Sequence, residues 1–224
     1  MRKLLRANVS RLLRDRAFWL AALMAALGAS MAVVNAVHAR QDGEIWTMDY
    51  TLFIYVILAP ILASVFTALF IGNEHSSGAM RNKLIAGHRR GCIYLADLLV
   101  SCCAGICLCL AFALPQAGLG LLLKGEWKAA PAELAIYIGL SFALMLAFTA
   151  LFTLIAMLCQ NKTHTTAGCI LLTFALLFAG VYISSTLEEP EYLEAYSYTE
   201  NGVTVEEPEQ KNPYYISGVN AHVT

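Results

Sequence analysis

Four cysteines in one apolar stretch are the first candidates for chemistry, because cysteine thiolates bind metal ions. Cys103 and Cys107 are one helical turn apart, and Cys102 and Cys109 lie beside them. No histidine or acid joins the group, and cysteine is also a small apolar residue that lets helices pack closely. We favour packing over metal binding, so the sequence predicts no metal site.

Two acids stand out by their positions, Glu74 at the end of one apolar stretch and Asp97 near the start of the next. An ionisable side chain within a membrane span is by default a functional hypothesis. We expect Asp97 to reach water or to pair with Arg89 or Arg90, and both a functional and a structural role stay open. Glu74 has three expected fates: bonding to a helix N-terminus, pairing with Arg81, or solvation.

Sequence motifs of several enzyme classes are absent. The chain contains no GxxxxGK[ST] phosphate loop, no HExxH, no GxSxG and no paired aspartates within its apolar stretches. His75, His88 and His164 lack the spacing of metal ligands. The sequence therefore predicts neither an ATPase site nor an intramembrane enzyme, and Asp97 alone gives little support to an ion-coupled carrier.

A polar segment, EHSSGAMRNKLIAGHRR, separates two apolar stretches at residues 74–90. Its basic residues are Arg81, Lys83, Arg89 and Arg90. Basic loops of this length tend to stay in the cytosol. Ser76, Ser77 and Gly78 are expected to begin a short helix. Its apolar side chains fall on one side: Met80, Leu84 and Ile85. Such a helix, lying across the ends of two spans, offers a docking face to a soluble partner.

The composition assigns these residues to an integral membrane protein. Of 224 residues, 58% are hydrophobic and only 14% are charged, and the mean hydropathy is +0.61. Apolar runs predict an all-α protein with a transmembrane domain over residues 1–187 and five spans, at about residues 17–38, 50–72, 93–114, 134–158 and 166–187. All seven cysteines lie in or beside these runs, so disulfides are not expected to stabilise the fold.

Residues 1–16 predict an interfacial helix with one apolar and one cationic face. Its basic residues are Arg2, Lys3, Arg6, Arg11, Arg14 and Arg16. We expect them, with Arg89 and Arg90, to lie at the membrane interface. A secretory signal peptide is the disfavoured alternative, because the following apolar run is long enough to span a bilayer.

Prolines modify two of the expected spans. Pro60 lies in the middle of the second span and should kink it, either as a hinge or as a fixed bend, with Ser64 and Thr67 available to bond freed backbone groups. Pro115 follows the third span, for which a broken or re-entrant end is an open alternative.

Charge fixes the expected orientation. Residues 188–224 form an acidic segment with eight glutamates and turn signals at Asn201-Gly202 and Asn212-Pro213. With the N-terminus inside, eleven basic residues are cytosolic and four are external, in agreement with the positive-inside tendency. We expect a multi-pass protein of the plasma membrane with a cytoplasmic N-terminus and an extracellular acidic tail.

The polar loop resembles that of membrane subunits of type-2 ATP-binding-cassette exporters, and of small Gram-positive bacterial permeases that include peptide-antibiotic and lantibiotic immunity types. The loop has the form E-x-x-x-G-[small]-x-R with a basic end. The matching residues are Glu74, Gly78, Ala79, Arg81, Leu84, Gly87, Arg89 and Arg90. The segment Asn212 to Gly218 also looks like an outer-segment motif of those permeases.

The resemblance implies a homodimer or paired permease that binds a separate ATPase subunit, which carries the ATP and Mg²⁺. The loop between the second and third spans would be the coupling helix, and its coupling residues would be Glu74, Gly78, Met80, Arg81, Leu84, Ile85 and Gly87. Such permeases have six spans per subunit. Because only five are predicted here, we expect the acidic segment to be incomplete before a missing sixth span.

Two functions remain open from the sequence. The first is an exporter subunit that couples ATP hydrolysis by its partner to efflux of a peptide antibiotic, a lipid or a drug. The alternative is a non-transporting sensor or assembly subunit whose acidic tail binds a ligand or partner. Lipid is an expected partner in both cases and nucleic acid in neither.

Overall fold

The computed structural model describes residues 2–39, 48–159, 161–187, 192–193, 196–200, 203–207 and 210–212. The chain divides into two compact units, Met1–Thr173 and Phe174–Thr224. The first unit contains helices α1 to α7 and the beginning of α8, and the second contains the rest of α8 and four short strands.

The first two helices are α1 (Arg2–Arg14) and α2 (Arg16–Ala39), and Asp15 separates them. The Asp15 carboxylate accepts a hydrogen bond from the backbone N–H of Ala17 at 2.8 Å, as an N-cap residue does. Helix α1 buries Leu4 and Leu12 in apolar clusters of the bundle, whereas Leu13 is exposed. The helix expected to rest on headgroups therefore also packs on protein with part of its apolar face.

The second expected span begins later and ends later than residues 50–72. A short helix, α3 (Met48–Leu52), precedes the long helix α4 (Tyr55–Ser76), which contains Pro60. The Ser64 hydroxyl donates to the Ile61 carbonyl at 2.8 Å. In a helix the N–H of residue 60 would donate to the Val56 carbonyl, but proline has no N–H. The Ser64 hydroxyl does not replace that bond, because it donates to Ile61. Because α4 continues to Ser76, Glu74 belongs to the helix and not to a loop.

The polar loop contains helix α5 (Ala79–Ile85), which begins after Gly78. Gly78 is left-handed, with φ of 71°, and Gly87 beyond the helix has φ of 82°, so both turns need a residue without Cβ. The expected role of Ser76 and Ser77 is wrong. Their hydroxyls donate to carbonyls within α4 and close that helix, and α5 has no side-chain cap.

Helix α6 (Arg90–Leu122) is 33 residues long, about 50 Å at a rise of ~1.5 Å per residue. It continues through Pro115, so the alternative of a broken or re-entrant end is wrong. One proline removes a single backbone hydrogen bond, while Gln116 and Gly120, which follow it, are buried in the bundle.

The last two long helices are α7 (Pro131–Leu158) and α8 (Lys162–Leu187). Pro131 occupies the first turn of α7. Backbone N–H groups there have no acceptor within the helix, so a proline costs no hydrogen bond. At the start of α8, Lys162 donates from Nζ to Asn73 Oδ1 at 2.9 Å. A Cβ on Gly72 would lie 3.2 Å from Lys162 Cγ, so glycine allows this close approach to α4.

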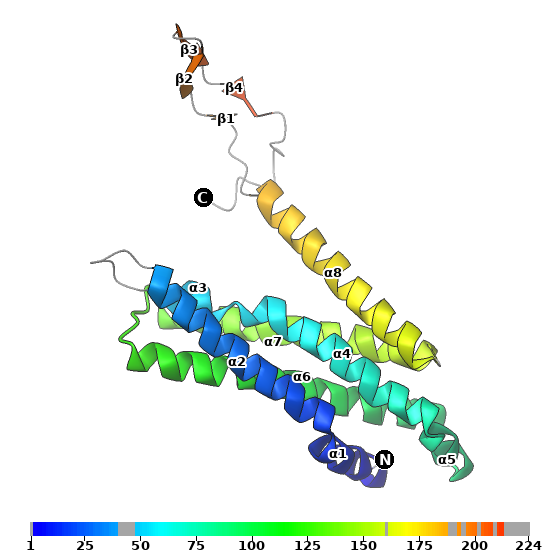
Figure 1. Cartoon of the computed structure of the whole chain (residues 1–224). Coiled ribbons are helices and arrows are strands. Elements are labelled where there is room, and N and C mark those ends of the chain that lie inside the picture. Colours follow the sequence, from blue (N-terminus) through cyan, green and yellow to red (C-terminus); the bar gives the residue numbers. More distant parts are fainter. Residues whose placement is uncertain are drawn as a thin grey trace. The chain divides into compact units, whose positions relative to one another are not determined.

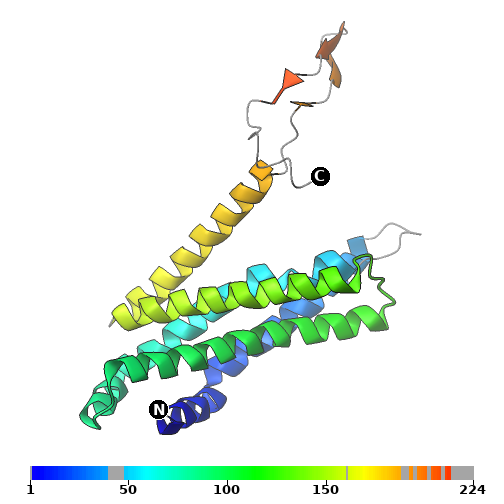
Figure 2. The same ribbon diagram turned by 180° about the vertical axis from the view of Figure 1, so that it is seen from behind.

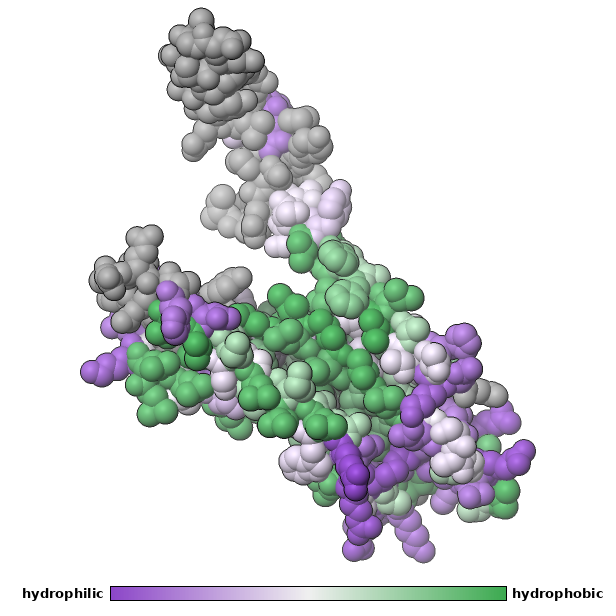
Figure 3. Space-filling view, viewed as in Figure 1, coloured by the Kyte–Doolittle hydropathy of each residue, from purple (hydrophilic) through white to green (hydrophobic). Residues whose placement is uncertain are grey.

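Within the described residues, five helices are long and apolar enough to cross a bilayer: α2, α4, α6, α7 and α8. This confirms the expected all-α membrane fold. Helices α2, α4, α6 and α7 lie side by side, and α1 and α5 lie at one end of them, which we call the α5 end (Figures 1 and 2). Hydrophilic side chains gather over α1 and α5, and hydrophobic ones follow the long helices (Figure 3).

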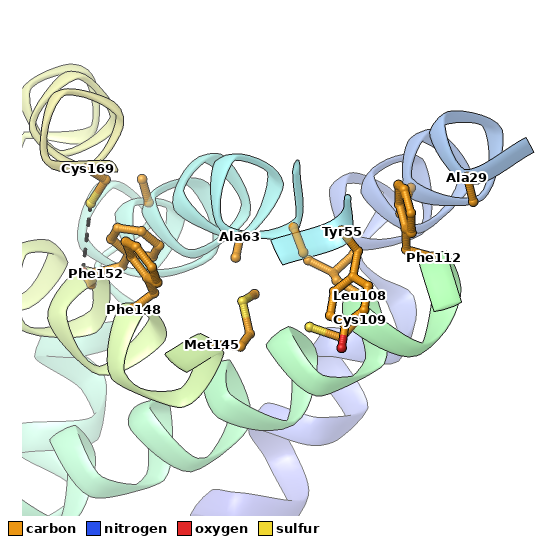
Figure 4. Close-up of a cluster of buried hydrophobic side chains, with 13 residues drawn as sticks. Ala29, Tyr55, Ala63, Leu108, Cys109, Phe112, Met145, Phe148, Phe152 and Cys169 are labelled. Atoms are coloured by element: carbon orange, nitrogen blue, oxygen red, sulfur yellow. Dashed lines mark hydrogen bonds between the residues drawn. The ribbon is translucent and has the colours of Figure 1, made fainter. Parts of the chain in front are cut away.

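The main core combines small and aromatic residues from different helices (Figure 4). Alanines of α2 and α4 face Phe112 of α6 and Phe148 and Phe152 of α7. The closest approach joins α6 to α7: a Cβ on Gly105 would lie only 2.7 Å from Thr149 Cγ2. Small residues at such contacts are the usual means by which membrane helices pack.

The second unit contains two antiparallel strand pairs. Strand β1 (Tyr192–Leu193) pairs with β4 (Gln210–Lys211), and β2 (Tyr196–Glu200) pairs with β3 (Val203–Glu207). The register places Glu200 opposite Val203. The turn signal at Asn201-Gly202 and the residues of the outer-segment motif after Asn212 lie outside the described residues.

Candidate functional site

A cluster of charged side chains at the α5 end joins four helices. It contains two acids, Glu74 from α4 and Asp97 from α6, and two bases, Arg11 from α1 and Lys83 from α5. Both carboxylates are buried, with exposed fractions of 1% for Glu74 and 0% for Asp97. The loop that the sequence singled out is therefore tied to the bundle by ion pairs.

Glu74 pairs with both bases. Lys83 Nζ lies 2.6 and 2.7 Å from its two carboxylate oxygens, and Arg11 Nη1 donates to Oε1. The guanidinium group of Arg11 also lies over the ring of Phe70, with its Cζ 3.7 Å from the ring centroid. Pairing with Arg81 and solvation, two expected fates of Glu74, are both wrong.

Asp97 is bound by residues that the sequence did not suggest. Its Oδ1 accepts a hydrogen bond from Asn8 Nδ2 and lies 3.4 Å from Lys83 Nζ. The other oxygen has no hydrogen-bond partner among the described residues. The expected pairing with Arg89 or Arg90 is wrong, because the helix directs Asp97 into the bundle toward α1.

The electrostatics of the cluster balance when all four groups are ionised, because the two acids face two bases. Burying a charge costs several kcal/mol, and only a partner with additional hydrogen bonds offsets that cost. Lys83 is shared between the two carboxylates and is itself only 16% exposed. A displacement of α5 would therefore change the electrostatic environment of two spans at once.

The three residues expected to form a docking face on α5 do not share one exposed surface. Met80 packs against a cluster formed by Leu4, Ile93 and Ala96. Leu84 is 38% exposed and Ile85 is 76% exposed. The accessible apolar part of the α5 surface is therefore the side of Leu84 and Ile85, with Met80 holding the helix to the bundle.

Lys83 and Asn8 are the functional candidates that sequence reasoning missed. A usable signal existed for Asn8: it lies four residues from both Leu4 and Leu12, so it is a polar residue within the buried stripe of α1. A polar residue at such a position needs a hydrogen-bonding partner. No comparable signal exists for Lys83, because its partners come from two other helices.

The cysteines do not gather around one point. All seven are free; Cys103 and Cys107 are exposed, and Cys109 is buried in the core. Cys102 Sγ lies 3.5 Å from Thr149 Oγ1 of α7. Over the residues described, no group of three or more histidines, cysteines or acids could hold a metal ion.

A family model described as ABC-2 family transporter protein matches residues 4–181. The chain belongs to this family. The match runs from α1 into α8 and includes all four charged residues of the cluster. This ABC-2 chain is thus a multi-pass membrane permease, a class that works with a partner ATPase subunit. Searches of curated proteins and of solved structures gave no match.

Proposed function

We propose that this ABC-2 permease is the membrane subunit of an exporter, and that a separate ATPase subunit docks on α5 and drives transport. The observation that carries the proposal is the position of Lys83, which lies on α5 and contacts an acid on α4 and an acid on α6. A push on α5 reaches both spans through these contacts, and it reaches α1 through Asn8 and Arg11.

The orientation belongs to the proposal. The α5 end carries most of the basic residues of the chain, which favours the cytoplasmic side of the plasma membrane. Five spans then put residues 188–224 outside. A partner with its own nucleotide site would reach α5 from the cytoplasm and carry the ATP and Mg²⁺. Its ATP-driven closure would push on α5. A second copy of the permease would complete the pathway for a peptide, lipid or drug.

The test uses Ile85, the most exposed apolar residue of α5. Replacing all three apolar residues of α5 would also disturb Met80, which packs on the bundle. Ile85→Asp instead places a charge on the exposed face alone. We expect at least a tenfold fall in the amount of ATP-hydrolysing subunit that co-purifies with the full-length permease, measured by immunoblot and by ATPase activity.

A matched control is Leu122→Asp at the opposite end of the bundle. Leu122 is 79% exposed and Ile85 is 76% exposed, so the two changes add the same charge to equally accessible positions. The control should retain the ATPase subunit. Undiminished ATPase in the Ile85 variant would overturn the proposal, and so would an equal loss in both.

A further inference from the structure

A pocket of about 740 Å³ lies at the α5 end, outside the ion-pair cluster. Its walls come from the end of α4, from α5, from the start of α6 and from the end of α7. Ile85, the centre of the proposed ATPase contact, does not line it, whereas Leu84 does. The pocket therefore adjoins the exposed face of α5 but does not include its most exposed residue.

The charged lining of the pocket is basic. Arg81 of α5 and Arg90 of α6 both line it, and no acid does. The structure gives neither arginine an ion pair with any described residue, because Arg11 and Lys83 already hold the nearby acids. His75 also lines the pocket. Two guanidinium groups suit an oxyanion, because arginine binds phosphate through paired N–H groups.

Apart from Ser76 and Gly78, the remaining lining of the pocket is apolar or aromatic. Met80 and Leu84 contribute from α5, Ile93 and Tyr94 from α6, and Met157 from α7. These residues surround the ends of helices that are long and apolar enough to span the membrane. That is the level at which lipid phosphates meet acyl chains.

We propose that this pocket binds an anionic phospholipid, with its phosphate on Arg81 and Arg90 and the start of its acyl chains against the apolar wall. The ligand is a resident lipid that bridges α5 and α6, and not a transported one. A free phosphate ion would satisfy the arginines but would leave the wall of Leu84, Ile93 and Met157 unused. The proposal needs no ATPase subunit, so it stands or falls separately from the proposed function.

The test measures lipid retention by the purified full-length chain. Native mass spectrometry in a mild detergent, after addition of phosphatidylglycerol, should show one tightly retained lipid per chain. Phosphatidylcholine at the same concentration should be retained at least tenfold less, and 10-fold molar excess inorganic phosphate, relative to lipid, should not displace phosphatidylglycerol. Displacement by phosphate would overturn the assignment of a lipid, because it would show a simple anion site.

Two double variants remove equal charge from the same end of the bundle. Arg81→Gln with Arg90→Gln removes both pocket arginines, and retention of phosphatidylglycerol should fall at least tenfold. Arg14→Gln with Arg89→Gln removes two exposed arginines that do not line the pocket, and retention should stay within twofold. Equal losses of phosphatidylglycerol in the two variants would show that only general surface charge matters, and would overturn the proposal. Undiminished retention of the lipid by the pocket variant would overturn it too. Circular dichroism of both variants establishes that the helices are intact.

Discussion

Lys83 is a single side chain that contacts two buried carboxylates from different helices. Glu74 and Asp97 come from different spans, and each has a further partner on α1, Arg11 for the first and Asn8 for the second. Lys83 is the residue whose removal affects both acids, since it lies 2.6 Å from one and 3.4 Å from the other. The importance of a charged residue here follows from the number of buried partners, not from its own exposure.

Replacing Lys83 by methionine should destabilise the permease by about 3 kcal/mol, because the buried Asp97 loses its cation and Glu74 loses one of two. The measurement is the free energy of unfolding in mixed micelles with increasing denaturant. Lys83→Met combined with Glu74→Gln should recover part of the loss, since the cluster then again holds one acid, Asp97, and one base, Arg11.

Arg81→Met is the control on the same helix, since the structure gives Arg81 no ion pair with any described residue. Its effect on unfolding should stay within about 0.5 kcal/mol, as for ordinary surface changes. Equal effects of the two methionine variants would contradict the role assigned to the cluster.

At the scale of elements, close contacts between helices depend on small residues at single positions. Gly105 lets α6 approach Thr149 of α7, and the alanines of α2 and α4 make room for aromatic side chains. Within a bilayer the helices gain little from the hydrophobic effect, so van der Waals contact at short range carries much of their association. A single added methyl group at such a contact is therefore costly.

Gly105→Ala should destabilise the bundle by about 1–3 kcal/mol, because the new Cβ would lie 2.7 Å from Thr149 Cγ2. Thr149→Ser removes that methyl group and should restore part of the stability in the double variant. The measurement is thermal unfolding of the detergent-solubilised chain.

Gly118→Ala and Gly139→Ala are the controls, since nothing lies within 4 Å of a Cβ at either position. They should be neutral or stabilising by up to ~1 kcal/mol, the difference in helix propensity. A Gly105 variant as stable as these two would show that α6 and α7 do not pack as described.

At the scale of the whole molecule, orientation in the membrane decides which surface a cytoplasmic partner meets. The α5 end is basic, and its three acids are engaged by the protein: Asp15 caps α2, and Glu74 and Asp97 lie in the ion-pair cluster. The positive-inside tendency counts the lysines and arginines themselves, and most of those in the chain lie at this end.

Ser77→Cys tests this orientation. Ser77 is exposed and lies between α4 and α5. In intact cells, a membrane-impermeant maleimide should label the Ser77→Cys variant no more than it labels the unmodified chain. After permeabilisation, the variant should carry one additional adduct. Lys128→Cys, at the opposite end, should react in intact cells. Reaction of the Ser77 variant in intact cells would invert the topology and remove the proposed ATPase contact.

The amino-acid sequence by itself determined the membrane class, the number of spans and the presence of a short helix between the second and third. These properties follow from local quantities: run length, periodicity and glycine positions such as Gly78. The same local signals misplaced the ends of several helices, because a helix end depends on what its last turn contacts. Helix α4 continues beyond residue 72 to include Glu74, whose carboxylate pairs with two cations inside the protein.

Only the tertiary structure decided the partners of the buried charges. Asp97 was expected to pair with its near neighbours Arg89 and Arg90, yet it bonds to Asn8, 89 residues earlier. Sequence distance carries no information about such contacts, because they form where four helices meet at one end of the bundle. The pocket beside them has the same origin, since Arg81 and Arg90 face one space only after α5 has folded back against α6.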